Sequence, residues 1–495
     1  MVFVSRVLSS KLRLRMAHVF VATWFISFTL SGCALVSPIP PDTEKKLERH
    51  YIFIHEEGFP IRIEPGVFRY SRIELTTIDY DKWINNILAP INGLVSRSAL
   101  TNEPVRLLFF VHGGLNTYRA EFQRMLDLMN EETGPFPKTT YYPIFINWNS
   151  SLFDSVIDDL FLVRLGRRRV IVGPLTSPFV AAGRFASVAL EAPKAWLNSL
   201  DNFSEGIRSA DSEGDDPADN ALTTLEAVAL SPIRAVTIPT VQGFGIGAWQ
   251  IMRRRVELAV ASRLTPHGEN YASEGAARTL FQRLQQKIEE EKKKNPNLNV
   301  EVTLVGHSMG AMLLNRLLTL AKPDLPIKRV VYLAPASRID DFEHYVLPFL
   351  ATHPSADVWW FSLSRADEAR ESHYLISPSG TLLVWIDNYF EPIAANGQTT
   401  GGRYRNLTEY YTDWLGKPDD NGLIKFDDKA GSRFNRTRGY RASMKDPNRP
   451  KQHGDFDQPR VFQTILCYVD PTAFRDQTVC PLSPTMFNSS SDLPE

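Results

Sequence analysis

The stretch that decides the fold is residues 300–318, which read VEVTLVGHSMGAMLLNRLL. A run of apolar and β-branched residues comes first, then the turn Gly306-His307-Ser308-Met309-Gly310, then leucines at helical spacing. This order predicts a buried strand, a tight turn and a helix. Such a turn leaves no room for side chains two positions before and after the serine, which accounts for both glycines. It also directs the first N–H groups of the helix toward the serine oxygen.

Segments on both sides of this turn alternate between strand and helix patterns. The alternation predicts an α/β fold, with a doubly wound and mostly parallel sheet covered by helices on both faces. The predicted strands are residues 51–55, 61–63, 67–78, 105–111, 141–148, 300–305, 330–333, 358–363 and 382–386. The predicted helices are residues 117–129, 276–293, 309–321 and 342–350.

A Gly-x-Ser-x-Gly turn between a strand and a helix resembles the nucleophile elbow of the α/β-hydrolase superfamily of serine esterases and lipases. The resemblance covers roughly residues 100–150 and 270–470. It implies an α/β-hydrolase fold with a large, mainly helical insertion, and it assigns Ser308 as the catalytic nucleophile.

The oxyanion loop of that superfamily has a counterpart in Val111-His112-Gly113-Gly114-Leu115-Asn116, which directly follows the strand at residues 105–111. The resemblance implies that a backbone N–H of Gly114 or Leu115 joins that of Met309 in the oxyanion hole. His112 precedes the elbow in the chain and is interpreted as a structural residue of this loop.

The base of the superfamily follows the last strand, which favours His453 in Gln452-His453-Gly454-Asp455-Phe456 among the ten histidines. His373 and His344 are the alternatives. One irregularity is that about 65 residues separate His453 from the predicted strand 382–386, so the sequence predicts long loops between them.

The acid of the triad is expected after a strand that lies between the elbow and the histidine. Asp367, just beyond the predicted strand 358–363, is the first candidate. Glu368 occupies the same place, and Asp340 and Asp341 follow the preceding strand. Each of these carboxylates could instead cap a helix or occupy its first turn.

The N-terminal residues have the pattern of a secretory signal, with four basic residues before an apolar run at residues 16–30. The run ends in Leu30-Ser31-Gly32-Cys33, which resembles the bacterial lipoprotein signal. The resemblance implies lipidation of Cys33 and membrane attachment through that lipid. Ala34 after the cysteine favours an outer-membrane lipoprotein of the bacterial cell envelope, facing the periplasm. A signal peptide cleaved without lipidation and an uncleaved anchor are the alternatives.

Composition excludes several function classes. The 495 residues carry 55 basic and 56 acidic side chains, a balance that argues against a nucleic-acid binder. Removing residues 1–32 would leave 51 basic and 56 acidic side chains and a net charge of −5. No metal or nucleotide motif is present, so no cofactor is expected. Cys467 and Cys480 could form a disulfide or remain unpaired thiols.

The predicted domain organisation places the surplus length in one insertion. It consists of a signal peptide (1–32), a lipidated tether (33–49), the hydrolase domain in two parts (50–149 and 271–480), a helical cap (150–270) between them, and a flexible tail (481–495). Basic clusters at Arg167–Arg169 and Arg253–Arg255 suit either a solvated cap surface or contact with anionic lipid.

These features together predict a lipid-anchored serine hydrolase acting on an acyl ester or thioester. The alternative is a non-catalytic envelope lipoprotein that kept this fold and binds a ligand or partner. The sequence leaves the oligomeric state open.

Overall fold

The computed structural model describes residues 47–64, 71–114, 117–184, 241–264, 270–371, 380–391, 399–410, 423–425, 437–441 and 450–480, with a few single residues between 186 and 238. The predicted signal peptide, Cys33 and the tail 481–495 lie outside the described residues. Residues 48–495 belong to one compact unit.

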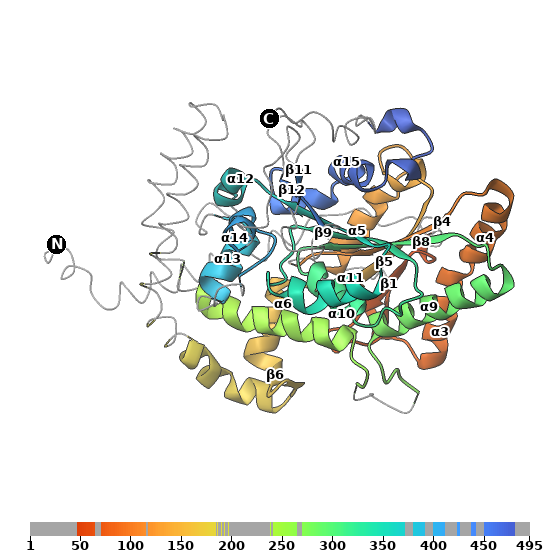
Figure 1. The fold of residues 1–495 in the computed structure, drawn as a ribbon. Helices are drawn as coiled ribbons and strands as arrows, with labels where there is room; N and C mark the ends of the chain where they lie inside the picture. Colours follow the sequence, from red (N-terminus) through yellow and green to blue (C-terminus); the bar gives the residue numbers. More distant parts are fainter. Residues whose placement is uncertain are drawn as a thin grey trace, which may run out of the picture. The chain divides into compact units, whose positions relative to one another are not determined.

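The core of this unit is a ten-stranded, mostly parallel β-sheet (Figure 1). Among the described strands, the seven from β12 to β1 run parallel, and antiparallel strands lie at the two edges. In spatial order they are β11 (Leu423–Lys425), β12 (Thr437–Arg441), β10 (Asp357–Ser362), β9 (Ile327–Leu333), β8 (Val300–His307), β4 (Val105–Val111), β5 (Tyr141–Trp148), β1 (Tyr51–Ile54), β2 (Pro60–Glu64) and β3 (Ser71–Glu74).

Helices connect the strands and cover the sheet. The α-helices are α3 (Thr77–Leu88), α4 (Pro90–Thr101), α5 (Tyr118–Leu128), α6 (Leu152–Ile157), α9 (Ala276–Lys294), α10 (Gly310–Leu318), α11 (Leu347–Thr352), α12 (Arg365–Arg370), α13 (Leu382–Trp385), α14 (Tyr404–Tyr410) and α15 (Pro459–Val469). Short 3₁₀ or π segments are η1 (Phe136–Lys138), η2 (Asp158–Leu162), η3 (Phe342–Val346), η4 (Ile386–Phe390), η5 (His453–Asp457), η6 (Pro471–Ala473) and η7 (Gln477–Val479).

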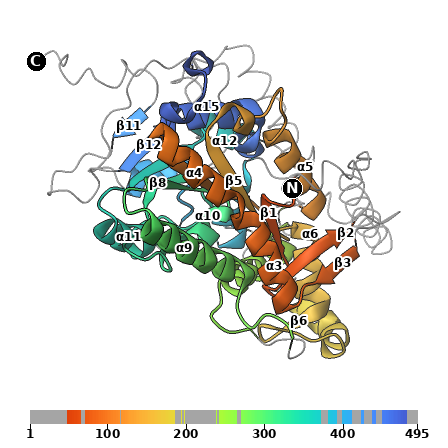
Figure 2. The same ribbon diagram turned by 90° about the vertical axis from the view of Figure 1, so that its right-hand side faces the viewer.

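The central strand β4 shows how the two faces of the sheet are covered. Successive side chains of a strand point to opposite faces. Phe109 packs edge-on against Phe281 of α9, whereas Phe110 packs edge-on against Phe462 of α15. Helices α9 and α10 therefore cover one face, and α5 and α15 cover the other (Figures 1 and 2). Every residue of β4 is buried, as a strand covered on both faces requires. The predicted α/β class is thus confirmed.

One predicted strand is wrong, and another is confirmed only in part. Residues 382–386 form α13 and the start of η4, because Thr381 caps a helix there by accepting the N–H of Val384. A short, fully apolar run does not distinguish a buried strand from a buried helix. The predicted strand 67–78 is confirmed in part: Ser71–Glu74 is strand β3, α3 begins at Thr77, and residues 67–70 lie outside the described residues.

The last parallel strand lies where the sequence predicts a loop. Strand β12, which reads TRGYR, pairs in parallel with β10. Strand β12 ends only about a dozen residues before His453. The distance between the last strand and the histidine is therefore short, and not the 65 residues counted from the predicted strand 382–386. The polar composition of the strand concealed it.

The described parts of the insertion are mainly helical, with a small hairpin. Helix α6 and η2 lead into the two-stranded hairpin β6 (Val163–Arg164) and β7 (Arg167–Arg168), and helices follow at residues 172–184 and 241–259. We call the second of these the cap helix. Among the described residues, no helix is both long and apolar enough to cross a bilayer.

A disulfide joins Cys467 of α15 to Cys480. It closes a loop with a sequence separation of 13 residues and fastens the segment after α15 to the face of the sheet that this helix covers. Of the two alternatives that the sequence left open, the structure shows the bonded one.

Candidate active site

The turn after β8 holds Ser308 in a strained backbone conformation. The φ angle of Ser308 is 50°, in the left-handed region that non-glycine residues rarely adopt. Its N–H donates to the carbonyl of Leu333 on β9 (2.8 Å), and its carbonyl accepts from Ala336 (2.9 Å). These bonds, together with the start of α10, hold the turn in place. They compensate for a conformation that costs about 1–3 kcal/mol.

Both glycines of the turn are required by close packing. A Cβ on Gly310 would lie 2.1 Å from the carbonyl oxygen of Val111, and one on Gly306 would lie 2.9 Å from Cα of Ala311. Neither distance is possible for a real side chain, which confirms the steric reason predicted from the sequence.

The glycine loop after β4 lies directly against the serine. A Cβ on Gly113 would come within 2.8 Å of Cβ of Ser308, and one on Gly114 would come within 3.0 Å of Sδ of Met309. The loop therefore approaches the serine as closely as a backbone can. Leu115, the other predicted oxyanion residue, lies outside the described residues.

The serine hydroxyl itself is buried, with only 1% of Ser308 exposed. No described residue forms a hydrogen bond with its Oγ. A hydroxyl in this position is not committed to a structural hydrogen bond, which is unusual for a buried polar atom.

His453 begins η5 and lies beside the elbow. Its ring centroid is 5.2 Å from that of His307, the residue before Ser308. The Nε2 of His307 donates to the carbonyl of His453 (3.0 Å), since a carbonyl oxygen can only accept. The structure thus places the predicted base beside His307, the residue that precedes the predicted nucleophile, although the two positions are 145 residues apart in the chain. His344, on η3, lines the cavity described below together with Asp340 and Asp341, and His373 is outside the described residues.

A series of buried polar side chains connects the loops around this turn. Asp457 of η5 contacts Nδ1 of His307 (3.1 Å) and Nε of Arg124 (2.9 Å). Arg124 also contacts Glu121 (3.3 Å), which contacts Nδ1 of His112 (3.0 Å). The series connects the loop of His453, the elbow and the glycine loop through helix α5.

His112 is structural, as its place in the glycine loop predicted. It is completely buried, and its Nε2 accepts the backbone N–H of Trp148 (3.0 Å), so Nδ1 carries the ring proton. Burial lowers the pKa of His112 well below its usual value and raises that of Glu121 well above its usual value. The Nδ1–H of His112 donates to the carbonyl of Gly113 (2.7 Å), with Glu121 3.0 Å from the same nitrogen, and burial disfavours a charge on either side chain.

Glu371, at the end of α12, is a carboxyl that contacts the loop of His453. It was not among the acids predicted from the sequence. Its Oε2 accepts the backbone N–H of His453 (2.7 Å). Burial raises the pKa of Glu371 to about 7, opposed by the His453 hydrogen bond and reinforced by the charges of Asp455 and Asp367. A signal existed in the sequence, because Glu371 is the third acid of the segment that follows β10.

The predicted acids have other partners. Asp367 lies in the first turn of α12, where it accepts from the hydroxyl of the N-cap residue Ser364 (2.9 Å). Glu368 is buried, accepts the N–H of Tyr404 (3.1 Å) and lies 3.7 Å from Nε of Arg403. Asp367 thus occupies the first turn of a helix, which is one of the alternatives that the sequence left open.

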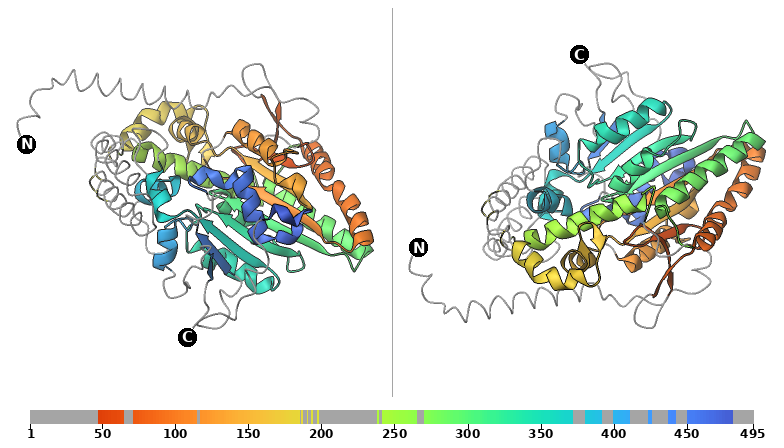
Figure 3. Two further views of the ribbon diagram at one scale, coloured as in Figure 1. Left: turned by 90° about the horizontal axis from the view of Figure 1, so that it is seen from above. Right: turned by 90° about the horizontal axis from the view of Figure 1, so that it is seen from below.

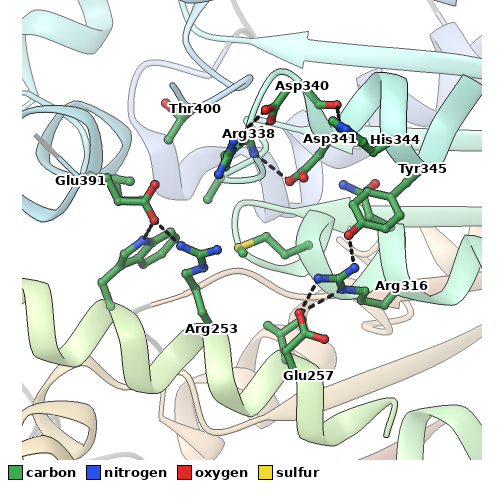
Figure 4. Close-up of a pocket in the computed structure, with 16 residues that line it drawn as sticks. Arg253, Glu257, Arg316, Arg338, Asp340, Asp341, His344, Tyr345, Glu391 and Thr400 are labelled. Carbon is green, nitrogen blue, oxygen red and sulfur yellow. Dashed lines mark hydrogen bonds and ion pairs between the residues drawn. The ribbon is translucent and has the colours of Figure 1, made fainter. Parts of the chain in front are cut away.

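Asp340 and Asp341 line a cavity of about 280 Å³ (Figure 4). Asp340 forms an ion pair with Arg338 (2.7 Å), and Asp341 accepts the N–H of Arg338 (3.0 Å). The cap helix, α10, η3 and the segment after β9 enclose the space. Met312, one helical turn after Ser308, is part of its wall, whereas none of residues 306–310 lines it.

The cavity wall carries both signs of charge. Arg253 pairs with Glu391 (2.6 Å), and Arg316 pairs with Glu257 (2.6 Å), both across the space between the cap helix and its neighbours. Figure 4 shows these pairs together with Arg338 and its two aspartates. Such a wall suits a polar group better than a long acyl chain.

Comparison with known protein families, curated proteins and solved structures gave no significant match. Among the described residues, no group of three or more His, Cys, Asp or Glu side chains could hold a metal ion.

Proposed function

We propose that the chain is a lipid-anchored serine hydrolase of the α/β-hydrolase fold that cleaves a carboxylic ester or thioester through an acyl-enzyme on Ser308. The observation that carries the proposal is the elbow. It presents Ser308 at a φ of 50°, between the glycine loop and the loop of His453. A strained, uncommitted serine at the carboxyl ends of parallel strands, in a turn that contacts the loop of His453 through His307, supports acyl transfer.

The proposed mechanism assigns one task to each element. His453 takes the proton of Ser308 as the hydroxyl attacks the acyl carbon, and returns it to the leaving group. The N–H of Met309, at the N-terminus of α10, and that of Gly114 stabilise the oxyanion. Water then attacks the acyl-enzyme, with His453 acting as the base again.

Glu371 is the better-supported carboxyl for the third position of the triad. It contacts the backbone of His453, whereas Asp367 is engaged in the first turn of α12. Both carboxyls lie on the segment after β10, and the charge of Asp367 acts on Glu371. A negative charge at Glu371 would stabilise the imidazolium that forms when His453 accepts the proton of Ser308.

A fluorophosphonate probe tests the nucleophile on the full chain. We expect the wild type to be labelled and Ser308→Ala to lose the label completely. Ser96→Ala, which removes an exposed hydroxyl on α4, is the matched control and should label normally. An unlabelled wild type would favour the non-catalytic lipoprotein, and labelling that survives Ser308→Ala would move the nucleophile elsewhere.

A pair of amide variants tests the acid. With an ester that the wild type turns over, we expect Glu371→Gln to lower kcat by about 100-fold or more, and Asp367→Asn to lower it by less than about tenfold. The opposite ranking would return the role to Asp367.

A series of acyl esters of increasing chain length would then define the substrate class.

The anchor is tested separately. Incorporation of labelled palmitate into the wild type, and its loss in Cys33→Ser, would support lipidation of Cys33. Incorporation that persists in the variant would refute it.

A further inference from the structure

The hairpin and helix at residues 161–184 turn their apolar side chains toward solvent. Leu165 at the tip of the hairpin is 100% exposed, Ile171 is 78% exposed and Phe179 is 79% exposed. We call the whole set the outward apolar face; its members are Phe161, Leu165, Val170, Ile171, Val172, Leu175 and Phe179. Val172, Leu175 and Phe179 recur at helical spacing on one side of the helix at residues 172–184.

The opposite, small and polar side of this helix is fastened to the protein. Arg164 donates to Oγ1 of Thr176 (2.7 Å) and to the carbonyl of Gly173 (2.8 Å). Ser177 is buried and donates to the carbonyl of Leu160 (2.6 Å). A surface helix normally buries its apolar stripe and exposes its polar one. Here the arrangement is reversed, and specific hydrogen bonds hold it that way.

Basic side chains lie within the outward apolar face. Arg167, Arg168 and Arg169 are all exposed, and they occupy the positions between Leu165 and Val170. In Figures 1 and 3 the yellow segment that carries them, labelled β6 in Figure 1, lies at the periphery of the fold, away from the central sheet. Exposed apolar side chains interleaved with arginines suit the interface of an anionic bilayer, which offers acyl chains and phosphates at adjacent depths.

We propose that the outward apolar face and Arg167–Arg169 form a surface that docks on an anionic lipid bilayer. The apolar side chains enter the interfacial region while the guanidinium groups contact lipid phosphates. The proposal concerns a folded surface and stands whether or not the chain is a hydrolase.

The hairpin is joined to the part of the fold that borders the candidate active site. Arg254 of the cap helix donates to the carbonyl of Gly166 at the hairpin tip (2.8 Å) and forms an ion pair with Glu57 (2.8 Å). The cap helix also lines the cavity whose wall includes Met312 of α10. Docking through the hairpin therefore fixes the orientation of the cap and its cavity relative to the bilayer, which a flexible N-terminal tether alone would not do.

An environment-sensitive fluorophore on the full chain tests the surface directly. Leu165→Cys is labelled with nitrobenzoxadiazole and mixed with vesicles of phosphatidylcholine and phosphatidylglycerol at 3:1, and the signal is read above that of the unsubstituted chain treated in parallel. Leu100→Cys on α4, where the native leucine is 88% exposed, is the matched control. We expect a severalfold rise in emission at position 165, quenched by spin-labelled lipid, and no change at position 100. Equal responses at both positions, or none at 165, would overturn the proposal.

Charge reversal tests the role of the arginines. In the Leu165→Cys chain, changing Arg167, Arg168 and Arg169 to Glu should weaken docking by on the order of 100-fold, since each basic residue contributes about a fivefold factor at an anionic surface. Arg97→Glu, Lys293→Glu and Arg475→Glu change exposed positions elsewhere by the same total charge and should leave docking unchanged.

Two outcomes of this comparison would contradict the proposal. If the control triple weakens docking equally, net charge and not this surface governs binding. If the emission rises without vesicles and grows with protein concentration, the outward apolar face binds a second copy of the chain.

Discussion

The chain contains three consecutive arginines twice, and the two triplets have opposite environments. In Arg253–Arg255 every guanidinium pairs with a carboxylate of the same chain: Arg253 with Glu391, Arg254 with Glu57 and Arg255 with Asp158. In Arg167–Arg169 all three residues are exposed. The guanidinium of Arg168 lies 4.0 Å from a carboxylate oxygen of the same Asp158.

The difference shows that a cluster of basic residues in the sequence does not by itself indicate whether the side chains are exposed or paired within the fold. Both triplets were predicted to belong to a solvated or lipid-facing surface. Arg253 is indeed exposed, but for Arg255 the prediction is wrong. Arg255 is only 2% exposed, and it also donates to the carbonyl of Asn149 and the hydroxyl of Ser155. Acidic residues from other segments pair with every arginine of one triplet, whereas the described part of the chain gives the other triplet one long contact, between Arg168 and Asp158.

The largest effect on stability should come from replacing Arg255. Replacing it with Met leaves the buried carboxylate of Asp158 without its main partner, which should lower the free energy of unfolding by about 3–5 kcal/mol. Denaturant unfolding followed by circular dichroism measures the loss. Adding Asp158→Asn should restore part of the stability, because the uncompensated charge is then removed. A loss below about 1 kcal/mol for Arg255→Met would show that the two triplets do not differ as the structure indicates.

Glu371 extends the comparison to a buried carboxyl whose partner is a backbone N–H, in contrast to Asp158, whose partner is Arg255. Its pKa of about 7 in the folded protein, against an ordinary value of 4.5, means that the folded state keeps a proton which the unfolded state releases. Stability should therefore fall as the pH rises from about 4.5 to about 7, by on the order of 2 kcal/mol. Glu371→Gln cannot titrate, so its unfolding midpoint should change less between pH 5 and pH 8 than that of the wild type. An equal change in both proteins would show that Glu371 is ionised in the folded protein at pH 5.

Arg254 should have an intermediate effect. Its two ion-pair contacts with Glu57 are partly exposed to solvent, so Arg254→Ala should cost about 1 kcal/mol. The loss should shrink in the Glu57→Gln background, and a double-mutant cycle in denaturant measures that coupling. No coupling would mean that Arg254 acts only through the carbonyl of Gly166.

The smallest effect on stability should come from the exposed triplet. Changing Arg167, Arg168 and Arg169 to Ser should alter the free energy of unfolding by no more than about 0.5 kcal/mol per residue, because exposed side chains make few contacts that folding creates. The same variant should still lose vesicle binding if the docking proposal holds. A large loss of stability would show that these arginines serve the fold.

Much of the fold could be predicted from local patterns. Strands β4, β5 and β8 lie within one residue or two of the predicted ranges, because each is rich in apolar and β-branched residues and is buried along nearly its whole length. Strand β12 could not be predicted, because TRGYR has neither an apolar run nor alternation. Its pairing with β10 supplies the stabilisation that its composition does not.

The site divides in the same way. Ser308, Met309 and Gly114 come together because one strand–turn–helix and one glycine loop follow adjacent parallel strands, β8 and β4. Chain order then indicated His453. Glu371 and the series of buried side chains from His112 to Asp457 depend on contacts between helices α5 and α12 and the histidine loop, which no local pattern records.

The sequence by itself determined the elbow, since only glycine fits at positions 306 and 310 and only a strand followed by a helix produces such a turn. It also determined the α/β class, through the spacing of its apolar residues. Tertiary structure decided which carboxyl reaches His453, which arginine triplet is paired and which apolar side chains remain outside. These depend on distances between residues far apart in the chain, and burial acts on charge and apolar surface only after those distances are set.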